Sequence, residues 1–185
     1  MKMDYKQPDF YRFNEDSTKL IHFVKNHLNF NPDSVLDLGA GCGVLGIEFC
    51  QGKKHELTLV EAQEEFLTSL QDNLDIFKLK AEIIIASFSE VHFNKKFDLI
   101  LSNPPYFYQG EGRISPNLNK QICRTWTKDD LSILLHLIRD TLSSSGEAWL
   151  SLRADEKTVK TIESLCSRFK IYPQNENLIY VCVWA

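Results

Sequence analysis

The chain has 185 residues, of which 43% are hydrophobic and 25% are charged. This suits one compact α/β domain over residues 1–185 and leaves no room for a second full domain. The net charge of -4 gives no electrostatic sign of nucleic-acid binding. The polar N-terminus does not resemble a secretory signal, and no apolar run approaches the roughly 20 residues of a membrane-spanning helix. The five cysteines form no C-x-x-C pair, so we expect reduced thiols, no metal site and a cytoplasmic protein.

Strand-like and helix-like segments alternate along the chain. Helices are expected over residues 15–28, 44–50, 64–77, 128–142 and 156–169, and strands over 34–38, 57–60, 81–86, 97–101, 148–152, 170–172 and 178–184. This α/β order predicts a mostly parallel sheet of seven strands with helices on both faces. The last two strands are joined by a short polar link, which suits a hairpin and predicts one antiparallel edge strand.

A glycine cluster directly follows the strand that ends at Leu38, and its members are Gly39, Gly41, Gly43 and Gly46. Glycines between a strand and a helix let the backbone approach a ligand closely. Ligands of open parallel sheets bind at the carboxyl ends of the strands. The stretch from Gly41 to Gly46 also fits the dinucleotide fingerprint G-x-G-x-x-G, and Glu61 could serve as the acid of that motif.

Asp37, which precedes the glycines, favours a different cofactor. S-adenosylmethionine carries an ammonium group and a sulfonium that an acid can bind, whereas a dinucleotide offers a pyrophosphate that Asp37 would repel. Glu61, at the end of the second strand, can accept hydrogen bonds from a ribose diol. We therefore expect S-adenosylmethionine as the cofactor, and a dehydrogenase is the remote alternative.

The loop Asn103-Pro104-Pro105-Tyr106 ends the strand over residues 97–101, since prolines cannot donate to a β-ladder. Asn103 Oδ1 and the Pro104 carbonyl can accept both N–H bonds of an exocyclic amino or carboxamide nitrogen. They would help this poorly nucleophilic nitrogen to pyramidalise and would stabilise the positive charge that develops on it. Tyr106 offers a ring face for stacking. We therefore expect methylation of a planar nitrogen, with Asn103, Pro104 and Tyr106 as the catalytic residues.

Together these segments resemble class I, Rossmann-like methyltransferases over nearly the whole chain, with matching stretches at residues 35–43, 59–62 and 97–106. Within that group the sequence looks closer to the tRNA(Val) adenine-N6 methyltransferase family, also described as predicted O-methyltransferases. The similarity includes the aromatic-rich segment at 11–17, Phe107 after the Asn-Pro-Pro-Tyr loop, and Ile122-Cys123-Arg124. The family that methylates glutamine in peptide release factors carries an N-terminal helical domain, for which residues 1–30 leave no room.

The resemblance implies two sets of site residues. Those expected to bind the cofactor are Asp37, Gly39, Ala40, Gly41, Gly43, Glu61, Ala62, Ser87, Phe88 and Asn103. Those expected to bind the acceptor are Pro105, Tyr106, Phe107, Arg113 and Arg124. The long segment over 107–127 is expected to be a loop that closes over the acceptor. Tyr11 and Phe13 could pack against the cofactor, although core packing is favoured for both.

Two features depart from the family pattern. Ser87 stands where the third strand usually ends in an acid that contacts the cofactor adenine, and the chain is acidic overall. Basic side chains nevertheless gather after the Asn-Pro-Pro-Tyr loop, at Arg113, Lys120, Arg124 and Lys128. A phosphate-binding surface and a solvated loop are equally good readings of that cluster.

The leading hypothesis is an N-methyltransferase that acts on the exocyclic amino group of adenine in tRNA or another RNA. The alternatives are a methyltransferase for a protein glutamine amide or a small-molecule amine and, more remotely, a non-catalytic module that binds S-adenosylmethionine. The sequence is compatible with a monomer and leaves the oligomeric state open.

Overall fold

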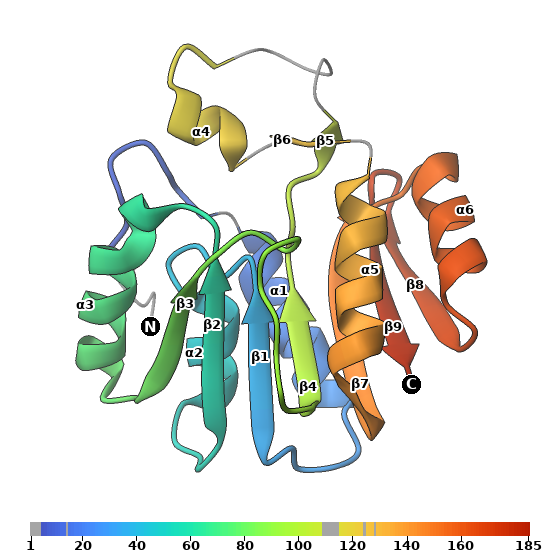
Figure 1. Cartoon of the computed structure of the whole chain (residues 1–185), viewed down its shortest axis with the longest axis horizontal. Coiled ribbons are helices and arrows are strands. Elements are labelled where there is room, and N and C mark those ends of the chain that lie inside the picture. The colour runs from blue at the N-terminus through green and yellow to red at the C-terminus, as the bar shows by residue number, and fades with distance from the viewer. Residues whose placement is uncertain (1–4, 14, 109–114, 124, 128) are drawn as a thin grey trace.

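The computed structural model describes residues 5–13, 15–108, 115–123, 125–127 and 129–185 (Figure 1). Its main sheet has seven strands in the order β3-β2-β1-β4-β7-β9-β8. These strands are β1 (Ser34–Leu38), β2 (Glu56–Glu61), β3 (Ala81–Ile85), β4 (Phe97–Ser102), β7 (Leu142–Arg153), β8 (Phe169–Asn175) and β9 (Leu178–Trp184). Strands β1, β2, β3, β4 and β7 pair in parallel. The expected seven-stranded, mostly parallel sheet is confirmed.

The expected antiparallel addition lies at the C-terminal edge of the sheet. Strand β9 runs antiparallel to both β7 and β8, so that β8 is outermost. All of β9 except Trp184 is buried, as befits a strand that is paired on both sides and covered on both faces.

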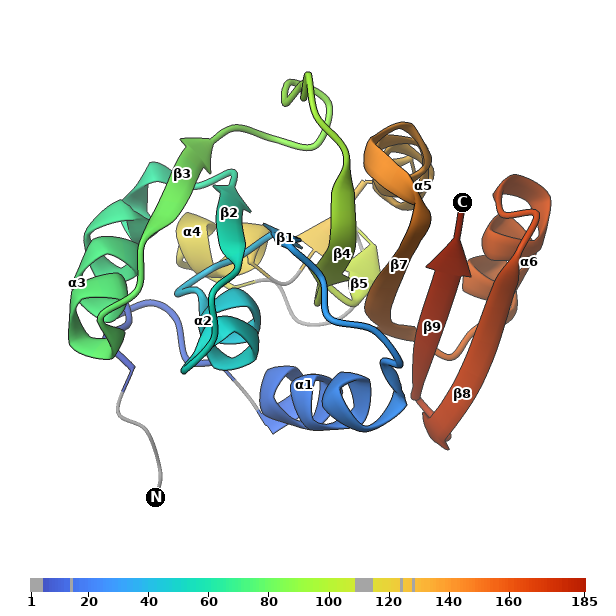
Figure 2. The ribbon, with the colours of Figure 1, turned by 90° about the horizontal axis from the view of Figure 1, so that it is seen from below.

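Helices cover both faces of the sheet, as the view from below in Figure 2 shows. They are α1 (Glu15–His27), α2 (Val44–Cys50), the 3-10 turn η1 (Glu64–Phe66), α3 (Leu67–Phe77), α5 (Asp130–Thr141) and α6 (Glu156–Leu165). Alternate strand residues enter two separate cores, because successive side chains of a strand point to opposite faces. Val35 packs in the core that contains residues of α1, α2 and α3, and Leu36 packs in the one that contains residues of α5 and α6.

The segment over 107–127 differs from the expected loop without secondary structure. It contains β5 (Phe107–Tyr108), α4 (Leu118–Ile122) and β6 (Thr125–Trp126), and β5 pairs in parallel with β6. Figure 1 shows these elements above the carboxyl ends of the strands. The pairing joins residues far apart in sequence, which local patterns do not reveal.

The two largest differences from the expected boundaries are in β7 and α6 (Glu156–Leu165). Strand β7 begins at Leu142, directly after α5, whereas this strand was expected to begin at residue 148. Asp98 on the neighbouring strand explains part of this extension, because its Oδ1 accepts the Ser143 hydroxyl at 3.1 Å. Helix α6 ends at Leu165, before the expected end at residue 169, because β8 begins at Phe169. In the described part of the chain, no helix is long and apolar enough to span a membrane.

Candidate active site

The register of the strands brings three segments of the chain together at the carboxyl edge of the sheet. Leu38 of β1 lies opposite Val60 of β2 and Ser102 of β4. The glycine loop, Glu61 and the Asn-Pro-Pro-Tyr loop begin at or just beyond these positions. Three segments that are distant in sequence therefore share one edge, where ligands of open parallel sheets bind.

The glycine loop folds back over the end of β2. The amides of Gly39 and Ala40 both donate to the Val60 carbonyl at 2.9 Å. Gly39, Gly41 and Gly43 have φ values of 75°, 56° and 84°, in the left-handed region where a side chain would be strained. A Cβ on Gly43 would lie 2.9 Å from Ile47 Cδ1, so this glycine permits close packing of α2 and does not face a cavity.

Glu61 is buried, and its carboxylate is oriented by backbone amides. Its Oε2 accepts the Gly41 amide at 2.8 Å, and its Oε1 accepts the Gln63 amide at 2.9 Å. Burial raises the pKa of Glu61, and these hydrogen bonds oppose the increase. Each oxygen keeps acceptor capacity after one such bond, so the carboxylate can still bind hydroxyl groups of a ligand.

Asp37 is held by the helix that follows the glycine loop. Its side chain is fully buried, and its Oδ2 accepts the Gly46 amide of α2 at 2.9 Å. It is not among the residues that line the two cavities described below. The bonded oxygen of Asp37 therefore anchors the first turn of the helix after the glycine loop. The other oxygen, Oδ1, has no hydrogen-bond partner among the described residues, so the expected contact of Asp37 with a cofactor stays a prediction.

Asn103 is held at both ends of its carboxamide. Its Nδ2 donates to Ser17 Oγ at 2.9 Å, and its Oδ1 accepts the Tyr106 hydroxyl at 2.6 Å. The same Tyr106 hydroxyl lies 3.0 Å from Ser151 Oγ and 3.3 Å from Asp16 Oδ2. Burial is the main cause that raises the pKa of Tyr106, so the phenol stays protonated.

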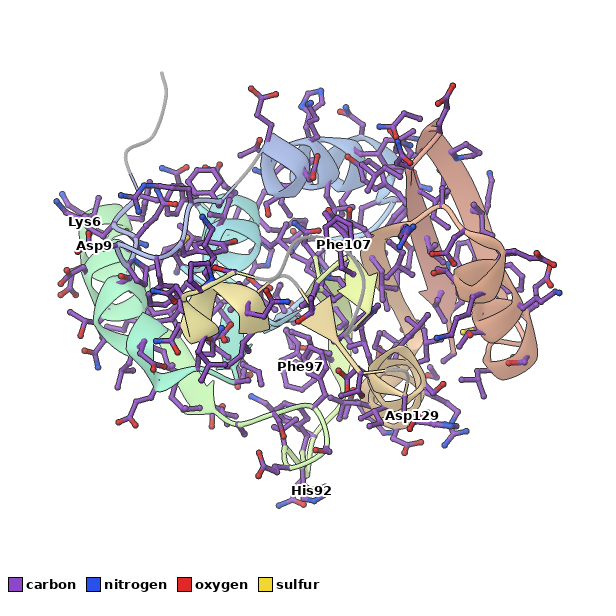
Figure 3. The ribbon with its side chains drawn as sticks, turned by 90° about the horizontal axis from the view of Figure 1, so that it is seen from above. Lys6, Asp9, His92, Phe97, Phe107 and Asp129 are labelled. Carbon is purple, nitrogen blue, oxygen red and sulfur yellow. The ribbon has the colours of Figure 1, made fainter. Side chains whose placement is uncertain are left out.

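Two cavities lie side by side at this edge. The first is lined by Tyr11, Gly39, Gly41, Glu61, Ala62, Gln63, Phe66, Ser87, Phe88, Ser89, Asn103, Pro104, Pro105, Ile122, Cys123, Thr125, Trp126, Asp130 and Ile133. The second is lined by Asp9, Phe10, Tyr11, Arg12, Asn103, Pro104, Pro105, Tyr106, Phe107, Lys120 and Cys123. Residues common to both are Tyr11, Asn103, Pro104, Pro105 and Cys123. Figure 3 looks down on this edge, with α4, β5 and β6 lying over it, Phe107 near its centre and Asp9 near α3.

Only some of the residues expected to bind the cofactor line the first cavity. Gly39, Gly41, Glu61, Ala62, Ser87, Phe88 and Asn103 line the first cavity, whereas Asp37, Ala40 and Gly43 do not. The Ser87 hydroxyl donates to Glu90 Oε2 at 2.6 Å, and the Ser87 amide bonds the same oxygen at 3.1 Å. Ser87 therefore already uses its proton in a local turn.

The expected acceptor residues Pro105, Tyr106 and Phe107 line the second cavity. Arg113 and Arg124, also expected there, lie outside the described residues, as does Lys128. Two other basic side chains, Arg12 and Lys120, line this cavity instead. Among the described residues, no group of three or more His, Cys, Asp or Glu side chains is placed to hold a metal ion.

Other cavity residues were missed or judged differently from sequence. Tyr11 packs against the core, as was favoured, and also lines both cavities; its ring meets Phe66 edge-on with centroids 5.0 Å apart. Gln63 is buried, donates from Nε2 to Cys123 Sγ at 3.1 Å, and has no partner for Oε1 among the described residues. Gln63 and Cys123 meet across the first cavity from distant segments, and no local motif marks either.

The strand order identifies the class of protein. It follows the dinucleotide-binding order as far as β7 and then departs from it, because β9 inserts antiparallel between β7 and β8. Solved structures with a similar fold include the 16S rRNA N2 methyltransferase of T. thermophilus, in complex with AdoMet and guanosine. Its TM-score is 0.72 at 21% identity, over 94% of this chain and 44% of that one. Another is the ribosomal protein L11 methylase of Lactobacillus delbrueckii, with a TM-score of 0.66 at 15% identity, over 94% and 80% of the two chains. The fold is that of class I, Rossmann-like methyltransferases.

The chain belongs to the methyltransferase small domain family, whose model matches residues 13–178. Curated relatives include the tRNA1(Val) (adenine(37)-N6)-methyltransferase of Shewanella halifaxensis, 27% identical over 143 residues, which are 75% of this chain and 56% of the relative. The enzyme of the same name from Actinobacillus pleuropneumoniae serotype 7 is 31% identical over 133 residues, 68% of this chain and 55% of the relative. The chain thus spans about half the length of these curated relatives.

Proposed function

We propose that this chain is an S-adenosylmethionine-dependent N-methyltransferase that methylates the exocyclic amino group of adenine in RNA, with tRNA as the first substrate to test. One observation carries the proposal. The two cavities adjoin along Asn103, Pro104 and Pro105, so a methyl donor in one cavity and a planar nitrogen in the other would meet at the loop that holds hydrogen-bond acceptors.

The residues of the first cavity fit the cofactor. Gly39 and Gly41 adopt positive φ values and line the cavity, so the backbone can approach a ligand where a side chain would intrude. The Glu61 carboxylate offers acceptors suited to ribose hydroxyls, and the unpartnered Oε1 of Gln63 offers another. When bound, the cofactor supplies an electrophilic methyl group on its sulfonium. The T. thermophilus structure with AdoMet supports this assignment by fold.

Asn103 and Pro104 would prepare the acceptor nitrogen. An exocyclic amine is a weak nucleophile because its lone pair is delocalised into the ring. Two acceptors, Asn103 Oδ1 and the Pro104 carbonyl, would bind its N–H bonds and favour the pyramidal nitrogen on which positive charge develops. The methylated cation is acidic, so no strong base is required.

Adenine in RNA is the favoured acceptor for two reasons. The curated relatives are named for adenine N6 methylation of tRNA, and Arg12 and Lys120 line the second cavity, where they could bind phosphates. An RNA substrate is also consistent with a cytoplasmic enzyme.

Transfer of a tritiated methyl group from labelled S-adenosylmethionine into total RNA and total protein tests this proposal. We expect label in RNA, recovered as N6-methyladenosine after digestion to nucleosides. Label found only in protein would reject the RNA acceptor and favour the glutamine alternative.

The variant Asn103→Ala tests the assigned acceptor group. We expect it to lower turnover by about 100-fold or more, the usual cost of one lost transition-state hydrogen bond. Its affinity for S-adenosylhomocysteine, measured by calorimetry, should fall far less than turnover. Turnover close to wild type would show that Asn103 does not serve the reaction.

A further inference from the structure

The side chain of Asn103 can bind an acceptor nitrogen only if its carboxamide plane is fixed. A free carboxamide rotates about its last torsion with little preference between orientations. Here both ends are bonded: Nδ2 to Ser17 Oγ at 2.9 Å and Oδ1 to the Tyr106 hydroxyl at 2.6 Å. Oδ1 has a second lone pair that remains for a substrate N–H.

The ring of Tyr106 is fixed through the same hydroxyl. Ser151 Oγ lies 3.0 Å from it and Asp16 Oδ2 lies 3.3 Å from it. The single proton of this hydroxyl can go to Asn103 Oδ1 or to Asp16 Oδ2, and its oxygen can accept the Ser151 hydroxyl, so its partners lie on α1, on β7 and on its own loop. Anchoring the hydroxyl sets the plane of the ring face that lines the second cavity.

The residues that bond this loop line neither cavity. Asp16 and Ser17 belong to the first turn of α1, far from Asn103 in sequence, and Ser151 belongs to β7. Ser17 and Ser151 are both buried, with exposures of 6% and 0%. Water is therefore poorly placed to replace either hydroxyl if it is removed.

We propose that Ser17 is a positioning residue for methyl transfer, which acts by holding the Asn103 carboxamide, and that Asp16 and Ser151 hold Tyr106 in the same way. This inference rests on the proposed function of Asn103. It makes the first turn of α1 part of the acceptor machinery, although no residue of that turn touches the acceptor cavity. Preorganised acceptors of this kind act on the transition state and change ground-state binding little.

The test compares Ser17→Ala with Thr18→Ala in the whole chain. Thr18 is the next residue in the same turn, is exposed, and bonds the Glu15 carbonyl at 2.9 Å, so it is a matched control. Ser17→Cys keeps the side-chain volume with a poorer acceptor, and it covers the case in which Ser17→Ala folds badly. For Ser17→Ala and Ser17→Cys we expect kcat for methyl transfer to RNA to fall by about tenfold, while KM for RNA and for S-adenosylmethionine change by less than about threefold. Thr18→Ala should keep the wild-type kcat.

A second measurement reads the Asn103 carboxamide directly, without turnover. Its side-chain NH2 signals in a 15N–1H spectrum can be assigned by their loss in Asn103→Asp. We expect faster solvent exchange of these protons in Ser17→Ala than in wild type and Thr18→Ala, because the bond to Ser17 is gone. Equal exchange rates, or a kcat for Ser17→Ala equal to that of Thr18→Ala, would overturn the proposal.

Asp16 is tested through Tyr106. Asp16→Asn should lower kcat in the wild-type background and have no further effect in the Tyr106→Phe background, since the hydroxyl through which it acts is absent. An undiminished effect in that background would show that Asp16 acts by another route. If the wild-type chain labels no RNA, the proposed function fails, whereas the exchange measurement still decides whether Ser17 holds Asn103.

Discussion

At the scale of single residues, burial strongly changes the acid–base chemistry of Asp37. It has no solvent exposure, and burial raises its pKa to about 7, with one opposing hydrogen bond from the Gly46 amide. A carboxyl whose pKa is higher in the folded than in the unfolded protein favours the folded state when protonated. That contribution is complete below the unfolded pKa near 4 and is lost as the pH rises through about 7.

Asp37→Asn should therefore make folding stability less dependent on pH. Asn keeps an acceptor for the Gly46 amide and has no charge to desolvate. Between pH 5 and pH 7.5, we expect the free energy of unfolding of this variant to increase relative to that of wild type. The increase should be at most about 1.4 kcal/mol per unit of pKa shift. Urea unfolding at several pH values measures this difference. Parallel pH curves for the two proteins would contradict the raised pKa.

The residues of the candidate site show which kinds of information local sequence carries. The positions of Gly39, Gly41, Glu61 and Asn103 at one edge followed from motifs that directly succeed strands. Tyr11, Gln63 and Cys123 line the first cavity because tertiary packing brings them there, and no spacing rule indicates it. One oxygen of Asp37, the acid before the glycines, binds the Gly46 amide, and the other has no partner among the described residues. The catalytic and binding roles of these residues stay predictions until they are measured.

At the scale of elements, β7 shows how tertiary pairing overrides local preference. Its first residues, Leu142 to Gly146, are rich in serine and favour a turn by composition. They extend the strand because Leu142 pairs with Phe97, and because Ser143 bonds Asp98 across a register irregularity in β4. Strands β1 and β4 were predictable because they are mostly apolar, and burial on both faces leaves a clear signal.

Gly146 is the residue that this arrangement constrains most closely. A Cβ at this position would lie 2.8 Å from the Asp98 carbonyl oxygen and 2.9 Å from Leu142 Cδ1. Since the carbonyl belongs to the backbone, it cannot move aside easily. We expect Gly146→Ala to lower the free energy of unfolding by about 1–3 kcal/mol, the usual range for overpacking. Ser144→Ala, at an exposed position of the same strand, is the control and should change it by less than about 0.5 kcal/mol. Denaturant unfolding of both variants checks this, and equal midpoints would show that the strand adapts.

At the scale of the whole molecule, charge is distributed unevenly around the site. The chain carries a net charge of -4, yet Arg12 and Lys120 line the second cavity from the N-terminal segment and from α4, with Asp9 as the acid beside them. A local basic rim on an acidic protein can bind a polyanion in one orientation, because phosphate contacts position a nucleic acid without reading its sequence.

Replacing Arg12 or Lys120 should lower both the affinity for RNA and the dependence of that affinity on salt. For Arg12→Ala and Lys120→Ala we expect the slope of log Kd against log salt to fall by about 0.7–0.9 per variant. Fluorescence anisotropy of labelled tRNA measures this, and affinity for S-adenosylhomocysteine should stay unchanged. Lys19→Ala, on α1 and ion-paired with Glu15, is a control away from the cavity. Slopes unchanged from wild type would place the RNA elsewhere.

The position of β9 has a consequence for how the protein is made. This strand pairs with β7 on one side and β8 on the other, although it is the latest of the seven to leave the ribosome. Until residue 184 has emerged, β7 and β8 cannot be bridged, and β7 presents an unpaired edge on the side that β9 later fills. Such edges recruit other strands and promote aggregation. Folding of the C-terminal half is therefore delayed until synthesis has passed its final strand, and chains that stall before it should be the ones that depend most on chaperones.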